Sequence, residues 1–372
     1  MGSVSEEGIM SCFMCNHSSI GIPGVIFQTC RMWTLPYATA LLSFLVLLLF
    51  GMSPAQAEDV RRLHGVVYLG DIPTLVASER GYFSGQGLDL DVHFGDSGKD
   101  NLELLRAGKT DFALMAVTPL VLDAVAREYA GDPNDPQVIA SISHSIGLNF
   151  VVTRAGNGIE HPVDLEGSRI ALVRGTNAEL LLHFFLEYYG LSVDQVRLVY
   201  LPVAEVFEAV AANEVDAAVL WEPWATRLDA RLGEPQQRFE VSNVYTARWL
   251  LVGRREIVQQ SAQAAEQVLQ AYAEAIRHID AYPEDAISLY ARHHGVEAED
   301  VAVRWHNFIY GLSLNWSLVT ALQQQAEWAR DAGYATPQVQ FRPLRLVDPR
   351  PLNAVQPAAI SLLGTVLQDP DS

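Results

Sequence analysis

The sequence predicts an α/β protein built from two similar lobes. Its 372 residues are enough for two domains. Short apolar runs alternate with longer segments that carry apolar residues at helical spacing, which is typical of strands alternating with helices. One strand–turn–helix pattern also occurs twice, in residues 105–119 and 210–223. Two equivalent units of this kind indicate two equivalent lobes with a ligand site between them.

Each copy of the repeated pattern contains an aspartate, a buried apolar strand and a proline near the start of a helix. Asp111 and Asp216 are the equivalent aspartates, and Pro119 and Pro223 are the equivalent prolines. Proline suits the first turn of a helix because its missing N–H has no partner there. Ligands of open α/β sheets bind outside the carboxyl ends of the strands, so we expect contacts where these strands end.

The overall composition excludes some classes of partner. Apolar residues make up 49% of the chain and charged residues 19%, as in globular proteins. The formal net charge of −19 argues against binding to nucleic acid and to an anionic membrane surface. A small anionic ligand remains compatible with this charge, because helix N-termini make a pocket locally positive.

Residues 35–52 form an apolar segment typical of a signal peptide. Ala55-Gln56-Ala57 follows it with the small-residue pattern of a signal-peptidase site, which predicts cleavage after Ala57 and a periplasmic protein. The alternative is an uncleaved membrane tether, but the apolar core, 41–50, is short for a membrane span. Both Met1 and Met32 are compatible with the start of this leader.

The cysteines predict no disulfide and no thiol chemistry in the mature protein. Cys12, Cys15 and Cys30 all lie in the leader, and no cysteine follows them. The Cys12–Cys15 pair has no second pair to complete a metal site. His293 and His294 are adjacent on a predicted helix and therefore point in different directions. We expect neither a metal nor a cofactor.

Lobe one is predicted to open with a strand that ends at Gly70 and Asp71. Its predicted strands are 64–69, 88–94, 111–117 and 138–143, and its helices are 72–80, 99–107 and 119–129. Ser97 can cap the second helix, and Gly98 lets the backbone approach a ligand closely, which suits an anion site. The alternative is an ordinary capped turn. Val117, Thr118 and His144 are further candidate ligand contacts, although a single histidine is more often a packed or surface residue.

Lobe two repeats this arrangement after a crossing near residues 145–150, where Asn149 is a candidate contact. Its predicted strands are 150–154, 169–173, 196–201 and 216–220, and its helices are 178–189 and 204–212. Gly175, Thr176 and Asn177 form the counterpart of the turn at Ser97, with good helix-capping residues and a glycine. Neither turn matches a nucleotide-binding motif.

The stretch 215–224 carries the strongest candidate contacts. Trp221 offers a flat stacking surface and an N–H donor at the end of a strand. Glu222 offers an acceptor for an amine, amide or hydroxyl. The alternative is that both tryptophans of this stretch pack the lobe and that Glu222 is solvated. Tyr245, in a second crossing near residues 243–249, completes the set of candidate contacts.

The rest of the chain is predicted to be scaffold. Helices are expected at 256–281, 283–293, 298–310 and 318–332, followed by a proline-rich tail that wraps the body. The predicted organisation is a leader (1–57), lobe one (58–147 and 247–335), lobe two (148–246) and the tail (336–372).

Several segments of the chain together resemble one protein family. They are SERGYFSGQGLDLDV (78–92), RAGKTDFALMAVTP (106–119), LEGSRIALVRGT (165–176), EVDAAVLWEPWA (214–225) and the tail segment DPRPLNAVQP (348–357). They are similar to the ABC-transporter substrate-binding proteins for sulfonate, nitrate and taurine and to the binders of thiamine pyrimidine precursors. The resemblance covers about residues 64–335.

The resemblance implies a periplasmic-binding-protein type II fold, with two Rossmann-like lobes joined by two crossover strands. It also implies a protein that closes on a small ligand and delivers it to the permease and ATPase subunits of an importer, and we expect a monomer. We expect the ligand to be a small organic anion or amine-bearing molecule of the sulfonate or taurine type, with a thiamine pyrimidine precursor as the alternative. Glu222 favours an amine-bearing ligand, such as an aminosulfonate or an aminopyrimidine, over bare nitrate. Lys99 and Arg174 are the only cations beside the two glycine turns.

An enzyme is the less favoured interpretation. The same fold family includes the pyrimidine synthase of thiamine biosynthesis, which consumes its own histidine and pyridoxal phosphate and carries a run of cysteines. Lys99 and Lys109 are the only lysines of this chain, and no cysteine follows residue 30. We therefore expect no enzymatic activity. A binding lobe that serves a sensor or chaperone instead of a transporter is a third possibility.

Overall fold

The computed structural model describes residues 61–362, except 67, 148 and 241–244. The chain divides into two compact units, Met1–Ala57 and Glu58–Ser372, and every described residue belongs to the second. The predicted signal peptide, its cleavage site and the three cysteines lie outside the described residues. Residues 243 and 244 of the second predicted crossing, 243–249, lie outside them as well.

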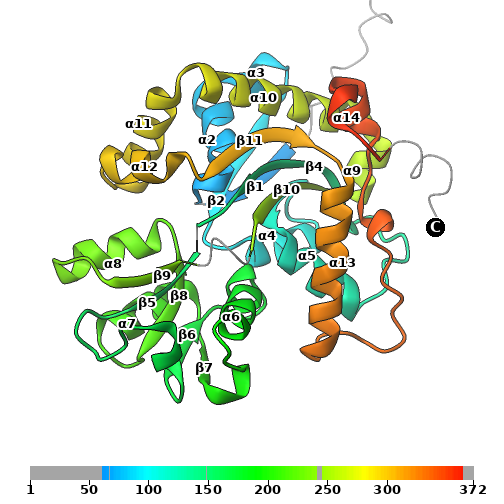
Figure 1. Cartoon of the computed structure of the whole chain (residues 1–372). Coiled ribbons are helices and arrows are strands. Elements are labelled where there is room, and N and C mark those ends of the chain that lie inside the picture. The colour runs from blue at the N-terminus through cyan, green and yellow to red at the C-terminus, as the bar shows by residue number, and fades with distance from the viewer. Residues whose placement is uncertain (1–60, 67, 148, 241–244, 363–372) are drawn as a thin grey trace, which may run out of the picture. The chain divides into compact units, whose positions relative to one another are not determined.

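Two sheets form the framework of the described residues (Figure 1). We call the six-stranded sheet and its helices lobe one, and the five-stranded sheet and its helices lobe two. In lobe one the strand order is β11-β4-β10-β3-β1-β2, formed by β1 (Arg61–Val66), β2 (Leu90–Gly95), β3 (Phe112–Ala116), β4 (Pro136–Ser145), β10 (Ala247–Arg254) and β11 (Phe308–Ser313). In lobe two the order is β7-β6-β8-β5-β9, formed by β5 (Asn149–Thr153), β6 (Arg169–Leu172), β7 (Arg197–Tyr200), β8 (Ala217–Trp221) and β9 (Gln237–Glu240).

The two sheets share one topology. In each, three parallel strands are followed by one antiparallel strand that enters from the other lobe: β10 beside β3, and β5 beside β8. Strand β4 leads into the first crossing, and β10 follows the second. The predicted α/β class and the two crossover strands are confirmed.

The repeated aspartates perform the same task in both lobes. Asp111 Oδ2 accepts a hydrogen bond from the backbone N–H of Arg62, the second residue of β1, at 3.0 Å. Asp216 Oδ2 accepts one from the backbone N–H of Arg169, the first residue of β6, at 2.7 Å. Each aspartate therefore fixes the start of the parallel strand beside its own, which explains why the motif occurs twice.

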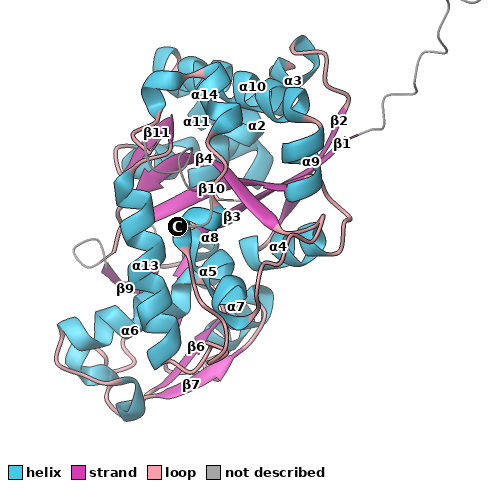
Figure 2. Cartoon of the chain, turned by 90° about the vertical axis from the view of Figure 1, so that its right-hand side faces the viewer, coloured by secondary structure: helices cyan, strands magenta, loops and turns pink. Residues whose placement is uncertain are grey.

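Helices cover both faces of the sheets, as Figures 1 and 2 show. In lobe one they are α2 (Ile72–Glu79), α3 (Tyr82–Gly85), α4 (Gly98–Arg106), α5 (Val117–Ala126), α9 (Arg255–Gln260), α10 (Ala262–Ala281), α11 (Pro283–His294), α12 (Ala298–Trp305), α13 (Trp316–Asp331) and α14 (Arg350–Val355). In lobe two they are α6 (Asn177–Tyr188), α7 (Val203–Ala211) and α8 (Trp224–Leu232). Strands β3 and β8 are buried along their whole length, as expected for parallel strands covered on both faces.

Three element predictions were wrong. The first strand lies at Arg61–Val66 because it pairs with β2 over that range, and Leu69–Asp71 forms a short 3₁₀ turn instead. The helix predicted at 256–281 is divided at Ser261, whose φ of −124° is not helical. The helix predicted at 298–310 ends at Trp305, and Phe308–Ser313 forms β11, in which aromatic and β-branched residues favour a strand.

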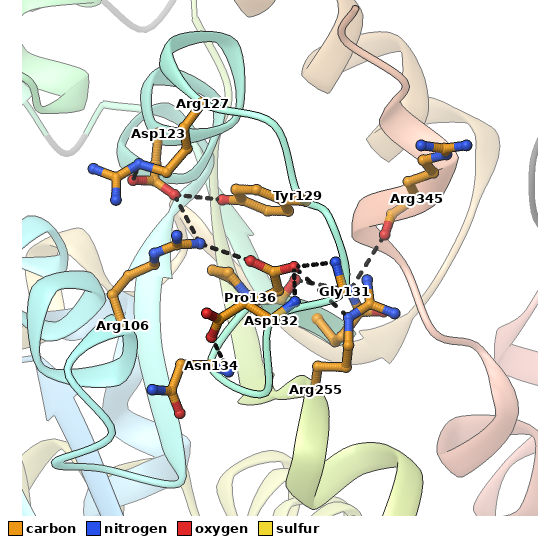
Figure 3. A network of polar contacts seen from close by, with 12 residues as sticks. Arg106, Asp123, Arg127, Tyr129, Gly131, Asp132, Asn134, Pro136, Arg255 and Arg345 are labelled. Atoms are coloured by element: carbon orange, nitrogen blue, oxygen red, sulfur yellow. Dashed lines mark hydrogen bonds and ion pairs between the residues drawn. The ribbon is translucent and has the colours of Figure 1, made fainter. Parts of the chain in front are cut away.

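A polar network connects the loop between α5 and β4 to the end of α4 and the start of α9 in lobe one (Figure 3). Its centre is Asp135, which is buried and accepts a hydrogen bond from Arg106 at 3.0 Å and from the backbone N–H groups of Gly131 and Asp132, each at 2.9 Å. The segment after α13 also packs on this lobe. In it, Asp348 donates its backbone N–H to the carbonyl of Val138 at 2.9 Å, which attaches this part of the tail to β4.

Candidate functional site

Tyr68 and Trp221 bring a strand end of each lobe into contact. Tyr68 follows β1 and Trp221 is the last residue of β8. Their rings meet edge to face with centroids 5.6 Å apart, and both side chains are buried. The Tyr68 hydroxyl donates to the carbonyl of Asp96 at 2.9 Å. One aromatic contact therefore joins the end of β8 to the loop that begins α4.

Trp221 and Asn149 each bury a polar atom without a hydrogen-bond partner among the described residues. The two are cross-strand partners on β8 and β5, so their side chains project from the same face of the sheet. The orphaned atoms are Nε1 of Trp221 and Oδ1 of Asn149. Leaving a buried donor or acceptor unpaired costs about 1–3 kcal/mol. One donor and one acceptor thus lie side by side where the lobes meet.

Glu222, the neighbour of Trp221, is occupied by other protein groups. Its Oε1 accepts from Arg238 at 2.8 Å and lies 3.0 Å from Nε of Arg304, and its Oε2 accepts from the backbone N–H of Thr226 at 3.1 Å. Arg238 stands on β9 of lobe two, whereas Arg304 stands on α12, which packs with α11 on lobe one. In this arrangement Glu222 links the lobes through a buried ion pair.

The turn before α4 holds a carboxylate of its own. Ser97 caps the helix by accepting from the backbone N–H of Asp100 at 3.2 Å, and its hydroxyl donates to the carboxylate of Asp100 at 2.7 Å. Gly98 is required by packing, because a Cβ there would lie 2.7 Å from Cα of Met115. The positive end of this helix is therefore already matched by a negative side chain.

The equivalent turn before α6 also contacts a carboxylate of its own lobe. Thr176 caps the helix by accepting from the backbone N–H of Ala178 at 3.2 Å. Gly175, whose φ is +75°, donates its N–H to Oε2 of Glu179 at 2.8 Å. Asn177 is half-buried as the first residue of the helix.

The two turns lie against each other across the lobes. A Cβ added to Gly175 would come within 3.7 Å of Cδ of Lys99. Beside them is a cavity of about 350 Å³ lined by both lobes. Its walls combine two cationic with two acidic side chains and are formed by Asp96, Ser97, Lys99, Asp100, Val173, Arg174, Tyr200, Leu201, Pro202, Val203 and Ala204.

Gly70 and Asp71 lie inside lobe one. Asp71 accepts from the backbone N–H of Val66 at 2.7 Å and from the hydroxyl of Thr74 at the start of α2. Burial raises the pKa of Asp71 to about 8. Gly70 lies under the indole of Trp249, where any side chain would collide with the ring. Both residues shape the core beneath the strand end.

The remaining candidates gather at the second crossover strand. Thr118 donates to the side-chain carbonyl of Gln325 at 2.8 Å, and the amide of Gln325 donates to the Tyr245 hydroxyl at 3.3 Å. Val117 is buried beside Thr118. His144 pairs in register with Arg248, and desolvation, followed by the charge of Arg248, lowers the pKa of His144.

Sequence reasoning missed Tyr68, Glu179 and Tyr334 as contributors to this region. Tyr68 could have been predicted from the sequence, because it also lies near the end of a strand. Glu179 was treated only as part of a helix. Tyr334, which hydrogen-bonds to Glu179, is 155 positions away in the sequence, and no local pattern indicates that contact.

Two further observations limit what the described residues can do. They contain no group of three or more histidine, cysteine, aspartate and glutamate side chains placed to hold a metal. None of their helices combines the length and apolar character required to cross a bilayer.

Comparison with known proteins places these features in a family. The model of the family described as NMT1/THI5-like matches residues 71–286, more than half of the chain. A Brucella abortus protein named "Putative binding protein" is 26% identical over 250 residues, which cover 66% of this chain and 75% of that protein. A formylaminopyrimidine-binding protein of Halalkalibacterium halodurans is 29% identical over 145 residues, which cover 39% of this chain and 41% of that protein.

Solved structures show the same fold. The alkanesulfonate-binding protein of Xanthomonas axonopodis pv. citri, bound to MOPS, aligns with a TM-score of 0.65 at 18% identity, over 82% of this chain and 99% of that one. A desulfurization enzyme aligns with a TM-score of 0.57 at 17% identity, over 81% of this chain and 99% of that one. These likenesses establish the periplasmic-binding-protein fold.

Proposed function

The chain belongs to the NMT1/THI5-like family, and on that premise we propose that it is a periplasmic solute-binding protein. It captures a small ligand between its lobes and delivers it to the permease and ATPase subunits of an ABC importer. The leader directs export and is removed after Ala57. The protein acts as a monomer and releases its ligand chemically unchanged.

One observation carries this proposal: the orphaned donor of Trp221 and the orphaned acceptor of Asn149 lie side by side at the meeting point of the lobes. A ligand that accepts from the indole and donates to the amide oxygen would satisfy both atoms. The ends of β8 and β5, where the two atoms lie next to the other lobe, distinguish this pair from the other unpaired atoms of the described residues and support a binding role for it. Tyr68, from the opposite lobe, supplies an aromatic wall.

The charges around the site favour an amine-bearing or amide-bearing ligand over a bare anion. Asp100 and Glu179 occupy the helix N-termini that would otherwise attract an anion. A sulfonate or nitrate at either turn would face a carboxylate at close range, which is unfavourable. We therefore rank an aminopyrimidine-like ligand first and a taurine-like aminosulfonate second. The relative that binds formylaminopyrimidine agrees with this order.

A simple sulfonate is the third candidate ligand, and the cavity between the lobes supports it. Lys99 and Arg174 both line that cavity, so an anionic group there would meet two cations. In this case the ligand would lie in a cavity that Trp221 does not line. The structural relative with bound MOPS agrees with this alternative.

Titration calorimetry with a panel of ligands tests the proposal. The panel contains a formylaminopyrimidine, taurine, an alkanesulfonate and nitrate. We expect the pyrimidine to bind at micromolar affinity or better, about −8 kcal/mol, and nitrate not to bind. Mass spectrometry of the released ligand should find it unaltered. Tight binding of nitrate or the alkanesulfonate alone would overturn the ligand class, and turnover would overturn the non-enzymatic assignment.

A further inference from the structure

Tyr334 reaches from lobe one to a carboxylate of lobe two. Its hydroxyl donates to Glu179, with Oε1 at 2.8 Å and Oε2 at 2.7 Å. Glu179 lies in the first turn of α6. The same hydroxyl accepts from Nε of Arg174 at 3.3 Å, and the Arg174 guanidinium lies 5.7 Å from the centre of the Tyr334 ring. The contact is thus a charge-assisted hydrogen bond backed by a cation–π contact.

The Tyr334 backbone is fixed to lobe one. The residue follows α13, and its N–H donates to the carbonyl of Ala329 in that helix at 2.8 Å. Two residues later, Thr336 donates its N–H to the carbonyl of Val125 in α5 at 2.9 Å. The Tyr334 ring packs on Trp328, with centroids 5.9 Å apart. The Tyr334 side chain is therefore held in place by α5 and α13 of lobe one.

Glu179 connects this contact to the glycine turn of lobe two. The oxygen that accepts from Tyr334 at 2.7 Å also accepts the N–H of Gly175 at 2.8 Å. The turn formed by Gly175, Thr176 and Asn177 faces Lys99 of lobe one. The position of Glu179 therefore sets the position of this turn relative to lobe one.

We propose that Tyr334 is a positioning residue that latches the glycine turn of lobe two to lobe one through Glu179. The latch rests on the proposed function, because it regulates how long the lobes stay closed over a ligand. Separating the lobes breaks the Tyr334–Glu179 bond, while the bonds from Gly175 and Tyr200 to Glu179 stay within lobe two. The C-terminal segment thereby takes part in retaining and releasing the ligand.

The chain provides a matched control. Tyr200 on β7 donates to Oε1 of the same glutamate at 2.8 Å, and Arg174 lies 5.2 Å from the centre of its ring. Tyr200 and Glu179 both belong to lobe two, so this bond survives when the lobes separate. Tyr334→Phe and Tyr200→Phe each remove a hydroxyl that donates to Glu179. Only Tyr334→Phe removes a hydrogen bond between the lobes.

Distance measurement between two spin labels tests the latch without any ligand. Cys12, Cys15 and Cys30 are replaced by serine in the full chain, which leaves it without cysteine. Labels are then attached at Asp194→Cys on lobe two and Gln324→Cys on lobe one, both exposed positions. Double electron–electron resonance reports the populations of short and long distances. Thermal unfolding checks that each variant is folded.

The parent protein and Tyr200→Phe should show the same ratio of short-distance to long-distance molecules. Tyr334→Phe should lower the ratio of closed to open molecules about tenfold, as expected for a hydrogen bond to a charged acceptor. An unchanged distribution in Tyr334→Phe, an equal shift in Tyr200→Phe, or a parent without the short distance would each overturn the latch. Because the measurement uses no ligand, a wrong ligand assignment would leave its result unaffected.

Discussion

Asn149 stands opposite Trp221 on the neighbouring strand, and each buries a polar atom that no described residue satisfies. The pair lies where the antiparallel strand β5 enters lobe two from the first crossing. When the lobes open, the unpaired indole N–H of Trp221 and the unpaired amide oxygen of Asn149 should therefore become exposed. A solute that pairs with both atoms would be bound most strongly when the lobes close over it.

Trp221→Phe should weaken ligand binding while preserving most of the aromatic surface. Loss of the indole N–H removes one buried hydrogen bond, so we expect a loss of about 1 kcal/mol. Trp221→Ala also removes the ring and should cost about 2 kcal/mol or more, as central aromatic residues of binding sites do. Calorimetry with the tightest ligand of the panel measures both values.

Trp224→Phe is the control for this substitution. Trp224 lies three positions further on, packs against Phe207 within lobe two and also buries an unpaired Nε1. Its replacement should leave the affinity unchanged. Equal losses in the Trp221 and Trp224 variants would mean that the effect reflects packing of the lobe.

Asn149→Leu should move stability and affinity in opposite directions. Leucine has a similar shape but no orphaned acceptor, so the ligand-free protein should gain about 1 kcal/mol of unfolding free energy. Affinity for a ligand with a hydrogen-bond donor should fall, because its acceptor is gone. Denaturant unfolding and calorimetry provide the two numbers. A variant that is less stable yet binds normally would show that Asn149 serves the fold alone.

Glu222→Gln distinguishes an ion-pair role from a ligand contact. Its carboxylate is buried between Arg238 and Arg304, so the neutral amide should lower the unfolding free energy by about 2 kcal/mol. Glu240→Gln, at an exposed position on β9, should have no effect. The opposite pattern, with unchanged stability and a weaker affinity for an amine-bearing ligand, would restore the role that the sequence alone suggested for Glu222.

Asp71→Asn should change the pH dependence of stability. The pKa of Asp71 in the folded protein is about 8, above its ordinary value of 3.8, because burial disfavours the charged carboxylate. The folded state then binds more protons than the unfolded state between these values, so wild-type stability falls as the pH rises from 4 to 8. The variant lacks this titration. Its stability relative to wild type should rise across that window by more than about 1 kcal/mol, and a constant difference would contradict the assignment.

The sequence predicted the framework because its signals are local. Asp111 and Asp216 each precede a buried strand. In the structure each accepts a hydrogen bond from a backbone N–H near the start of the neighbouring parallel strand. The strand that ends at Trp221 was recognised from its apolar run and its flanking residues. These patterns extend over about ten residues, which is the range that periodicity can resolve.

The remaining features depend on contacts between distant segments. Glu222 was expected to be open to a ligand, but Arg304 approaches it from a helix 82 positions later. Tyr334 joins Glu179 across 155 positions. The first three residues of β11, 308–310, were predicted to be helical because the pairing of β11 with β4 is a tertiary contact. Such partners are chosen by the packed structure, so no local pattern in the chain predicts them.

The most direct test of the proposed site is the nuclear magnetic resonance signal of the Trp221 indole N–H. The chain contains seven tryptophans, and Trp221→Phe identifies the signal by its disappearance. Saturation with the tightest ligand of the panel should shift the Trp221 signal downfield and slow its exchange with water, because the N–H acquires an acceptor in the closed site. A bound ligand that shifts other indole signals and leaves that of Trp221 unchanged would contradict a binding site built on Trp221 and Asn149.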